Sequence, residues 1–304
     1  MEKYDVIIVG GGPAGVTASI YTARANLKTM VIEKTAVGGQ IVLSDVIENY
    51  PGFPEPMVPT KLLENMQKQA ENFGVKFEFD EITEIKKDGD GFILKSDWDE
   101  FHARAVILAV GSVPKKTNVP GEAKFMGKGV AFCATCDGPF FKDKDIVVVG
   151  AGNSGVQEGL FLLNYVRSIK FIEFLPKINA EKILQDRIKQ KDNVEFYLNT
   201  QLLEILGEDR ITGVKVKNRE TGEEKILPAE GVFVYIGYSP NTKFLEGVVE
   251  LDERGYIVTN ERLETSVKGI YAAGDVVKGV KSQVVIVAGS GATAAMNLIE
   301  DLDQ

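Results

Sequence analysis

The chain has 304 residues, enough for two globular domains, and its 44% hydrophobic and 26% charged residues are ordinary for a folded protein in water. The 35 Lys and Arg against 44 Asp and Glu give a net charge of −9 without a basic stripe, which argues against nucleic acid as a partner. No apolar run approaches the ~18–20 residues that a membrane span needs, which argues against a membrane protein.

The N-terminus runs from Met1 directly into a strand pattern, without the basic, apolar and cleavage regions of a signal peptide. We therefore expect a cytosolic protein with no domain fused before this start. Thiols are kept reduced in the cytosol, so a cysteine pair there is more often catalytic than structural.

The first predicted unit is a strand, a glycine turn and a helix. Residues 5–9 form an apolar strand pattern, and Gly10, Gly12 and Gly15 follow with the spacing Gly-x-Gly-x-x-Gly before a helix pattern over 16–24. In that setting the glycines allow a tight turn, close approach of the backbone to a pyrophosphate, and close packing of the helix on the strand. Free N–H groups at the helix start hold negative charge.

A second strand pattern, over 29–33, ends in a glutamate whose carboxylate suits a ribose diol. Shifted by 140 residues the whole pattern recurs: Glu33 corresponds to Glu173, and the glycines recur at Gly150, Gly152 and Gly155. Two complete motifs predict two dinucleotide sites. A degenerate packing motif is the alternative for the second, because a further glycine four residues on weakens its helix.

Turns, a helix and several strands are predicted between the two motifs. The predicted elements are a helix over 58–73 and strands at 75–79, 82–86, 91–95 and 101–110. The stretch from Asn49 to Pro54 is a proline-rich loop that cannot continue a helix or a central strand. Trp98 and His102 lie among charged residues, where we expect a surface or hairpin role for them rather than chemistry.

The only two cysteines of the chain, Cys133 and Cys136, are spaced Cys-x-x-Cys. A structural zinc site wants four Cys or His ligands, and beyond the two thiols the chain has only His102. A structural disulfide that closes so short a loop removes little entropy from the unfolded state. The pattern therefore favours a reversible dithiol that carries two electrons.

Asp137 directly follows the second sulfur and could exchange a proton with a thiolate as a general acid or base. A helix N-cap or a turn residue before Gly138 and Pro139 is the alternative role for it. Phe140 and Phe141 come next, and they are candidates either for docking a partner or for the core.

The second half of the chain returns to strands and a closing helix. The predicted elements are a helix near 181–191, strands at 194–198, 202–206, 211–217 and 231–236, and a turn at 220–223. A later strand ends in Gly274 and Asp275, where the carboxylate can accept a ribityl hydroxyl; a turn aspartate is the alternative. The small-residue run from Val284 to Leu298 predicts a helix packed tightly on the sheet.

Two proline-marked crossings, at Pro114 and Pro240, divide the chain. We predict an α/β protein with two Rossmann-like dinucleotide-binding domains, the second inserted into the first. The predicted boundaries are 1–112 plus 242–304 for the first domain and 116–238 for the inserted domain, which carries the cysteines.

With these motifs the chain resembles the low-molecular-weight bacterial thioredoxin reductases over nearly its whole length. The specific matches are the two glycine motifs, Gly38-Gly39-Gln40, the loop from Asn49 to Gly52, Cys133-Ala-Thr-Cys136-Asp137, Ile236-Gly237-Tyr-Ser-Pro-Asn241-Thr242 and Ala272-Ala-Gly274-Asp275. The resemblance implies FAD on the discontinuous domain, a pyridine nucleotide on the inserted domain, and a homodimer.

The resemblance also implies which residues would bind the cofactors. Those implied for FAD are Gly10, Gly12, Pro13, Ala14, Gly15, Glu33, Gly39, Gln40, Asn49, Ala109, Gly111, Gly274, Asp275, Gln283 and Val284. Those implied for the pyridine nucleotide are Gly150, Gly152, Asn153, Ser154, Gly155, Glu173, Ile236 and Gly237. The arginine that is common just before the Gln-Val pair is Ser282 here, and no metal is expected.

By the same resemblance, electrons would run from reduced nicotinamide through FAD to the dithiol and on to thioredoxin or a thioredoxin-like or glutaredoxin-like protein. Cys136 would face the flavin, Cys133 would attack the disulfide of the partner protein, and Asp137 would handle protons. The inserted domain would rotate on its two connections, with hinges at Pro114 and Pro240.

The sequence departs from the NADPH-using members just after the second strand of the inserted domain. There those members carry a His-Arg-Arg cluster that grips the 2′-phosphate, and here the chain reads Glu173-Phe174-Leu175-Pro176. A carboxylate favours a ribose diol and repels a phosphate, so we predict a preference for NADH, with Lys177 partly rescuing NADPH.

Three alternatives stay open. Ferredoxin or another non-pyridine donor could feed the same reaction, although a chain released from binding a pyrophosphate has no reason to keep the second glycine motif intact. A ferredoxin–NAD(P) reductase without dithiol chemistry is opposed by the two cysteines. A redox sensor that is not an enzyme would show no turnover with any thioredoxin.

Overall fold

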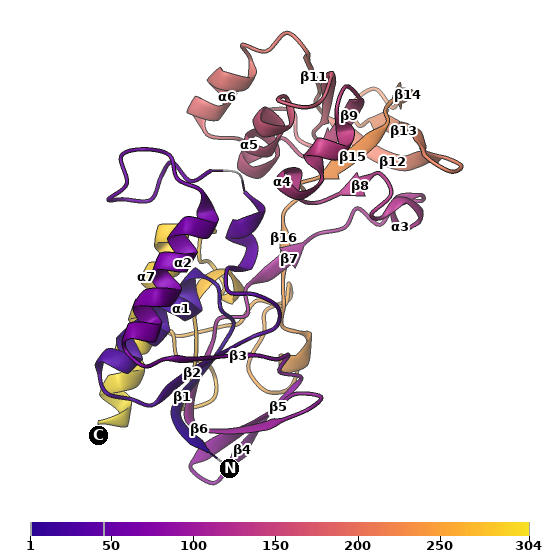
Figure 1. Cartoon of the computed structure of the whole chain (residues 1–304). Helices are drawn as coiled ribbons and strands as arrows, with labels where there is room; N and C mark the ends of the chain where they lie inside the picture. The colour runs from indigo at the N-terminus through magenta and orange to yellow at the C-terminus, as the bar shows by residue number, and fades with distance from the viewer. Residues whose placement is uncertain (1, 45, 304) are drawn as a thin grey trace. The chain divides into compact units, whose positions relative to one another are not determined.

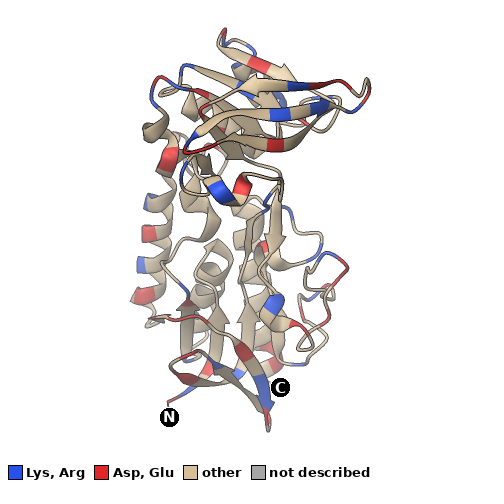
Figure 2. Cartoon of the chain, turned by 90° about the vertical axis from the view of Figure 1, so that its right-hand side faces the viewer, with Lys and Arg blue, Asp and Glu red and all other residues tan. Residues whose placement is uncertain are grey.

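The structure of the chain is a computed structural model that describes residues 2–44 and 46–303. The chain divides into two compact units, which are both visible in Figure 1. The first unit comprises Met1–Val42, Val46–Val113 and Ser239–Gln304, and the second comprises Leu43–Asp45 and Pro114–Tyr238. In the view of Figure 2, acidic and basic residues are interspersed on each unit.

The first unit is built on a seven-stranded sheet in the order β3-β2-β1-β6-β5-β4, with β17 paired to β6. Its strands are β1 (Lys3–Val9), β2 (Thr29–Glu33), β3 (Lys76–Phe79), β4 (Glu84–Asp88), β5 (Gly91–Lys95), β6 (Glu100–Leu108) and β17 (Ile270–Ala272). The pairs among β1, β2, β3, β6 and β17 are parallel, whereas β4, β5 and β6 pair antiparallel.

Side chains of β1 alternate between two cores, as the pleat of a strand requires. Val6 and Ile8 belong to the core shared with helices α1 (Pro13–Arg24), α2 (Pro59–Asn72) and α7 (Val284–Leu302), while Ile7 and Val9 belong to the core on the opposite face. All four side chains are buried. The apolar run of this strand therefore reflects a parallel strand that is covered on both faces.

Helix α7 is long and apolar enough, by length and composition, to cross a membrane, so the expectation that no segment approaches that length was wrong. Its small residues nevertheless pack closely on α1. A Cβ atom at Gly291 would collide with the backbone carbonyl of Ala14, and Ala294, Ala295 and Leu298 lie in the core of the first unit. The predicted closing helix is therefore present, with one face buried in protein.

The second unit contains a five-stranded parallel sheet in the order β11-β10-β9-β15-β8 and a three-stranded antiparallel sheet, β12-β13-β14. The strands are β8 (Val130–Ala131), β9 (Asp145–Val149), β10 (Ser168–Ile172), β11 (Val194–Tyr197), β12 (Thr200–Gly207), β13 (Ile211–Asn218), β14 (Glu224–Pro228) and β15 (Gly231–Val234). The helices are α3 (Glu122–Phe125), α4 (Ala134–Asp137), α5 (Asn153–Leu162) and α6 (Lys182–Ile188). The strand–helix–strand order β9-α5-β10 repeats that of β1-α1-β2.

Two short strands, β7 (Ser112–Pro114) and β16 (Tyr238–Pro240), pair with each other where the chain crosses between the units. The pairing is supported by backbone bonds on either side: the N–H of Lys115 donates to the carbonyl of Gly237, and the N–H of Asn241 donates to that of Gly111. Short 3₁₀ helices complete the described elements at Gly39–Leu43, Gly138–Phe141, Lys243–Leu245 and Gly274–Val276.

The predicted strands and helices are all present, with ends that differ by a few residues at most. Trp98 is 87% exposed in the turn between β5 and β6, and His102 lies on β6, so the surface and hairpin roles expected for them are confirmed. Strand β14 is not among the predicted strands, because its sequence, Glu-Lys-Ile-Leu-Pro, is charged and mostly exposed and has only one buried residue.

Candidate functional site

The first glycine motif forms the turn from β1 into α1, and its three glycines differ in what surrounds them. Gly10 has a φ of 108°, and a Cβ atom there would collide with the carbonyl of Ala109. A Cβ at Gly15 would collide with the carbonyl of Gly10. Gly12 instead has an ordinary φ of −76°, and its nearest neighbour would be the Cα of Gly39, 3.9 Å away. Gly10 and Gly15 are therefore packed closely against backbone carbonyls, and space remains beside Gly12.

Glu33 lies at the end of β2 and closes back on this turn. Its Oε2 accepts a hydrogen bond of 2.6 Å from the backbone N–H of Gly11, and its Oε1 accepts one of 3.1 Å from that of Thr35. A carboxylate has about four lone-pair sites, so each oxygen keeps room for a further donor such as a ribose hydroxyl.

Two predicted FAD-binding side chains of the first unit hold buried acceptors without a partner among the described residues. These atoms are Oε1 of Gln40 and Oδ1 of Asp275. Burial raises the pKa of the Asp275 carboxyl, while a hydrogen bond with Ser282 acts in the opposite direction. Buried acceptors are normally satisfied, so these two atoms fit a ligand that brings hydroxyl or N–H donors, as FAD does.

The structure places the other predicted FAD residues on the same unit. Pro13 and Ala14 form the first turn of α1, and Gly111 follows β6 with a φ of 61°. The side-chain amide of Asn49 donates a 2.9 Å hydrogen bond to Oε1 of Gln283, the residue before Val284 at the start of α7. Gly274 begins a 3₁₀ turn after β17, and its N–H donates to Oγ of Ser290.

The second glycine motif repeats the geometry of the first. A Cβ atom at Gly150 would collide with the carbonyl of Tyr235, and one at Gly155 with the carbonyl of Gly150. Gly152 has a φ of −81° and nothing within 4 Å of the place where its Cβ would lie. A Cβ atom at Gly159, the glycine expected to weaken the helix, would collide with the ring of Phe171, so the missing side chain allows helix and sheet to approach.

Glu173 follows β10 and mirrors Glu33. Its Oε2 accepts from the N–H of Ala151 at 2.6 Å and its Oε1 from that of Leu175 at 2.9 Å, and the residue is only 7% exposed. Asn153, predicted for the pyridine nucleotide, is bonded in both directions to Glu181, the residue before α6.

The remaining predicted nucleotide residues lie on the same unit. Ser154 is in the first turn of α5, Ile236 is 39% exposed, and Gly237 has a φ of 98°.

One residue beside Glu173 was not predicted from the sequence. The guanidinium of Arg219, which follows β13, lies 3.5 Å from the centroid of the Phe174 ring, and its NH1 donates to the carbonyl of Phe174. No local motif could have indicated this contact, because the two residues are 45 positions apart.

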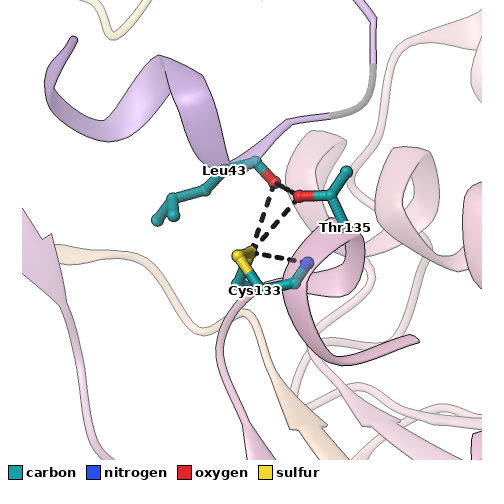
Figure 3. The surroundings of a disulfide bond; sticks show 4 residues. Leu43, Cys133 and Thr135 are labelled. Atoms are coloured by element: carbon teal, nitrogen blue, oxygen red, sulfur yellow. Dashed lines mark hydrogen bonds between the residues drawn. A yellow bond between two sulfur atoms is a disulfide. The ribbon is translucent and has the colours of Figure 1, made fainter. Parts of the chain in front are cut away.

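Cys133 and Cys136 are joined in a disulfide, with their Cα atoms 5.3 Å apart, at the start of α4 (Figure 3). The N–H of Cys136 donates a 3.1 Å hydrogen bond to Sγ of Cys133, and the hydroxyl of Thr135 donates one of 3.1 Å to the carbonyl of Leu43. Cys133 is buried at 8% exposure, whereas Cys136 is exposed. Among the described residues, no group of three or more His, Cys, Asp or Glu could hold a metal ion.

The residues that follow the dithiol separate into a buried and an exposed set. Asp137 is partly buried, and burial raises the pKa of its carboxyl. Phe141 is buried and packs edge-on against Phe233, with ring centroids 5.0 Å apart, so it belongs to the core. Phe140 is 74% exposed and stays a candidate for docking.

Comparison with known proteins gives full-length matches. A family profile for pyridine nucleotide-disulphide oxidoreductases matches residues 4–293. A thioredoxin reductase of Bacillus subtilis is 41% identical over 305 residues, which covers 99% of this chain and 96% of the relative. The crystal structure of T. acidophilum thioredoxin reductase has 39% identity and a TM-score of 0.96 over 100% of both chains. A ferredoxin-flavin thioredoxin reductase from Clostridium acetobutylicum has 30% identity and a TM-score of 0.55, over 100% of this chain and 99% of that one.

Proposed function

We propose that this chain, which belongs to the pyridine nucleotide-disulphide oxidoreductase family and within it to the low-molecular-weight thioredoxin reductases, uses NADH as its preferred electron donor. Electrons pass through FAD and the pair Cys133–Cys136 to thioredoxin or a thioredoxin-like protein, and NADPH serves less well. The observation that carries this proposal is the second glycine motif, with open space at Gly152 and a buried carboxylate, Glu173, at its ribose end.

We assign FAD to the first unit, where it supplies a two-electron carrier between a hydride donor and a disulfide. Support for this assignment comes from the protein's own atoms. Space beside Gly12 lets the backbone approach a pyrophosphate, and Glu33 can accept further hydrogen bonds from a ribose. Gln40 and Asp275 each have a buried oxygen atom without a hydrogen-bond donor among the described residues.

The second unit takes the pyridine nucleotide in this proposal, and Glu173 sets the preference for NADH. Its carboxylate can accept from the diol of an unphosphorylated ribose, each charge-assisted hydrogen bond being worth about 1.5–3 kcal/mol. A 2′-phosphate in the same place would be repelled by about 4 kcal/mol per charge pair at ~4 Å. Comparable kcat/KM values for NADH and NADPH would refute the preference.

Thiol–disulfide exchange with the acceptor protein needs only the two cysteine thiolates and the acceptor disulfide. The thiolate of Cys133 attacks one sulfur of the acceptor disulfide, forms a mixed disulfide and releases the other sulfur as a thiolate. The thiolate of Cys136 then attacks the sulfur of Cys133, releases the second acceptor thiolate and restores the Cys133–Cys136 disulfide. The N–H of Cys136 that donates to Sγ of Cys133 would stabilise the attacking thiolate.

Asp137 supplies the proton in this scheme. Its partly buried carboxyl has a raised pKa, so it holds a proton more readily than an exposed aspartate and can give it to a departing thiolate. The acceptor docks beside the dithiol, where Phe140 offers an exposed aromatic ring. We further propose that the enzyme works as a homodimer in the cytosol.

A second candidate donor is ferredoxin. Two observations favour it: the loop after β10 lacks the arginine pair of NADPH-using members, and a similar solved structure is that of a ferredoxin-flavin thioredoxin reductase. The intact geometry of the second glycine motif argues against this donor, because ferredoxin needs no pyrophosphate site.

One experiment separates the donors. The flavin-loaded protein is mixed anaerobically with NADH, NADPH or reduced ferredoxin, and the loss of flavin absorbance is followed in the wild type and in Gly152→Ala. The added methyl group has space and an allowed φ, so the fold is kept, but it enters the proposed pyrophosphate site.

We expect fast bleaching by NADH and a loss of at least about tenfold in that rate in Gly152→Ala, corresponding to about 1.4 kcal/mol. The matched control is Gly289→Ala on α7, where an added methyl group also meets nothing within 4 Å. Fast bleaching by ferredoxin alone, unchanged by Gly152→Ala, would show that the proposed donor is wrong.

A further inference from the structure

Arg219 lies at the end of the second glycine site where the ribose would be recognised. Its guanidinium carbon is 3.5 Å from the centroid of the Phe174 ring, and its NH1 donates a 2.9 Å hydrogen bond to the carbonyl of Phe174. Phe174 is the residue directly after Glu173, and half of it is exposed. The turn between β13 and β14 therefore brings a cation to the loop from which the arginine pair is missing.

The backbone around Arg219 holds it in this place. Its own N–H donates to the carbonyl of Asn199 at 2.7 Å, and the N–H of Asn199 in turn donates to the carbonyl of Leu175 at 3.0 Å. The next residue of this chain segment, Thr200, donates its N–H to the carbonyl of Glu173 at 2.9 Å. Three backbone bonds thus fasten the strand β12 and the turn of Arg219 to the loop that carries the ribose acid.

The turn itself is also ordered by its own bonds. The side-chain oxygen of Asn218 accepts from the N–H groups of Glu220 and Thr221, both at 2.9 Å, and its carbonyl accepts from the N–H of Gly222. Arg219 therefore projects from a closed turn rather than from a loose loop. Its guanidinium is oriented before a ligand arrives, so little conformational freedom is lost on binding.

A guanidinium stacked on an aromatic ring offers two properties to a nucleotide. Its flat face can stack with a purine, as arginine does with nucleic acid bases. Its positive charge attracts a phosphate, in opposition to the carboxylate of Glu173, and unlike lysine it presents several N–H donors in one plane.

We propose that Arg219, stacked on Phe174, is a specificity-determining residue at the adenosine end of the pyridine-nucleotide site. It stacks on the adenine of both cofactors, and its charge is what admits a 2′-phosphate beside Glu173. The inference rests on the proposed use of a pyridine nucleotide by the second unit. It identifies the guanidinium of Arg219 as the group that allows NADPH to serve as a poorer donor. The rival cation is Lys177, which is exposed on the same loop.

The test measures binding of two probes that differ only in the 2′-phosphate, adenosine 2′,5′-bisphosphate and adenosine 5′-monophosphate. Calorimetry on the flavin-loaded full chain gives both dissociation constants without turnover. The variants are Arg219→Gln, Arg219→Lys and Lys177→Ala. Arg210→Ala is the matched control, because Arg210 is an exposed arginine in the other turn of the same sheet.

We expect Arg219→Gln to weaken the bisphosphate at least tenfold and the monophosphate about threefold, which lowers the ratio between the two affinities. Arg219→Lys should keep that ratio within threefold of wild type, since charge remains, while both probes weaken through the lost stacking. Lys177→Ala and Arg210→Ala should leave both constants within twofold.

Three results would overturn the inference, and they differ in what else they affect. If the wild type binds the probes and Arg219→Gln binds them equally well, or if Lys177→Ala produces the loss instead, Arg219 has no such role and the donor proposal stands. If the wild type binds neither probe while reduced ferredoxin still bleaches the flavin, the inference and the pyridine-nucleotide donor both fail.

Discussion

Replacing Asp275 by asparagine should stabilise the protein without FAD and weaken its hold on FAD. In the structure Oδ1 of this carboxylate is buried and has no partner among the described residues, and burial raises the pKa of the group despite a bond with Ser282. A buried charge without full compensation costs free energy in the empty protein, and asparagine keeps the shape while removing the charge.

The two expected effects have opposite signs. A buried polar group without a partner costs about 1–3 kcal/mol, and a charged group costs more, so removing the charge should raise the free energy of unfolding of the FAD-free variant at pH 7 by up to about that much. The bond from a ribityl hydroxyl to a carboxylate is worth about 1.5–3 kcal/mol, so its loss should weaken FAD binding by about 10- to 150-fold. Asparagine keeps a neutral acceptor, which favours the lower end of that range.

The pH dependence checks the electrostatic cause. Because the folded pKa of Asp275 lies above its unfolded value of 3.8, the folded state binds the proton more tightly. The charge penalty is therefore present at pH values above the folded pKa and is relieved as pH falls through it. The stability advantage of Asp275→Asn should shrink in the same window and vanish below pH 3.8.

Urea unfolding of the FAD-free protein, and FAD titration followed by fluorescence, measure the two quantities. Asp97→Asn, in the exposed turn between β5 and β6, is the matched control and should change neither. An Asp275→Asn variant that is less stable than the wild type without FAD, or that binds FAD with unchanged affinity, would refute the reasoning.

Three further outcomes are expected. Cys136→Ser should trap a mixed disulfide with an acceptor thioredoxin, visible by mass spectrometry, and Cys133→Ser should not; trapping only in Cys133→Ser, whose remaining sulfur is the exposed one, would reverse the two roles. Asp137→Asn should lower kcat about 10²- to 10⁴-fold and abolish the fall of kcat/KM above the raised pKa of this group, and an unchanged pH profile would contradict its role as acid. Gly155→Ala should lose about 1–3 kcal/mol of stability, because its Cβ would collide with the carbonyl of Gly150; a thermal melt equal to wild type would contradict that packing.

The sequence predicted the parts of the fold that repeat a local pattern. The predicted α/β fold is confirmed by the comparisons, and the apolar runs of β1 and β9 and their glycine turns are present where the spacing indicates. The acids Glu33 and Glu173 lie against their glycine turns. Their hydrogen bonds to backbone N–H groups could not be predicted from the sequence, because they join residues that only the folded structure brings together.

The contacts that the sequence could not indicate join distant segments through side chains of unremarkable type. Arg219 lies in a polar turn, so the sequence alone predicts a solvent-exposed charge there. In the structure the antiparallel sheet brings its guanidinium onto the ring of Phe174. The residues assigned to FAD and the pyridine nucleotide, and the assignment of each cofactor to its domain, stay predictions, because their partner atoms belong to ligands.

The pairing of β6 with β17 has a consequence for the order of folding. Val106 lies opposite Ile270, so the central sheet of the first unit is completed only after the whole second unit has left the ribosome. Asp275, three residues beyond β17, arrives later still. The intervening segment can fold on its own contacts and so shorten the loop that must close. In a nascent chain the second unit would therefore be complete before the first unit has its last strand.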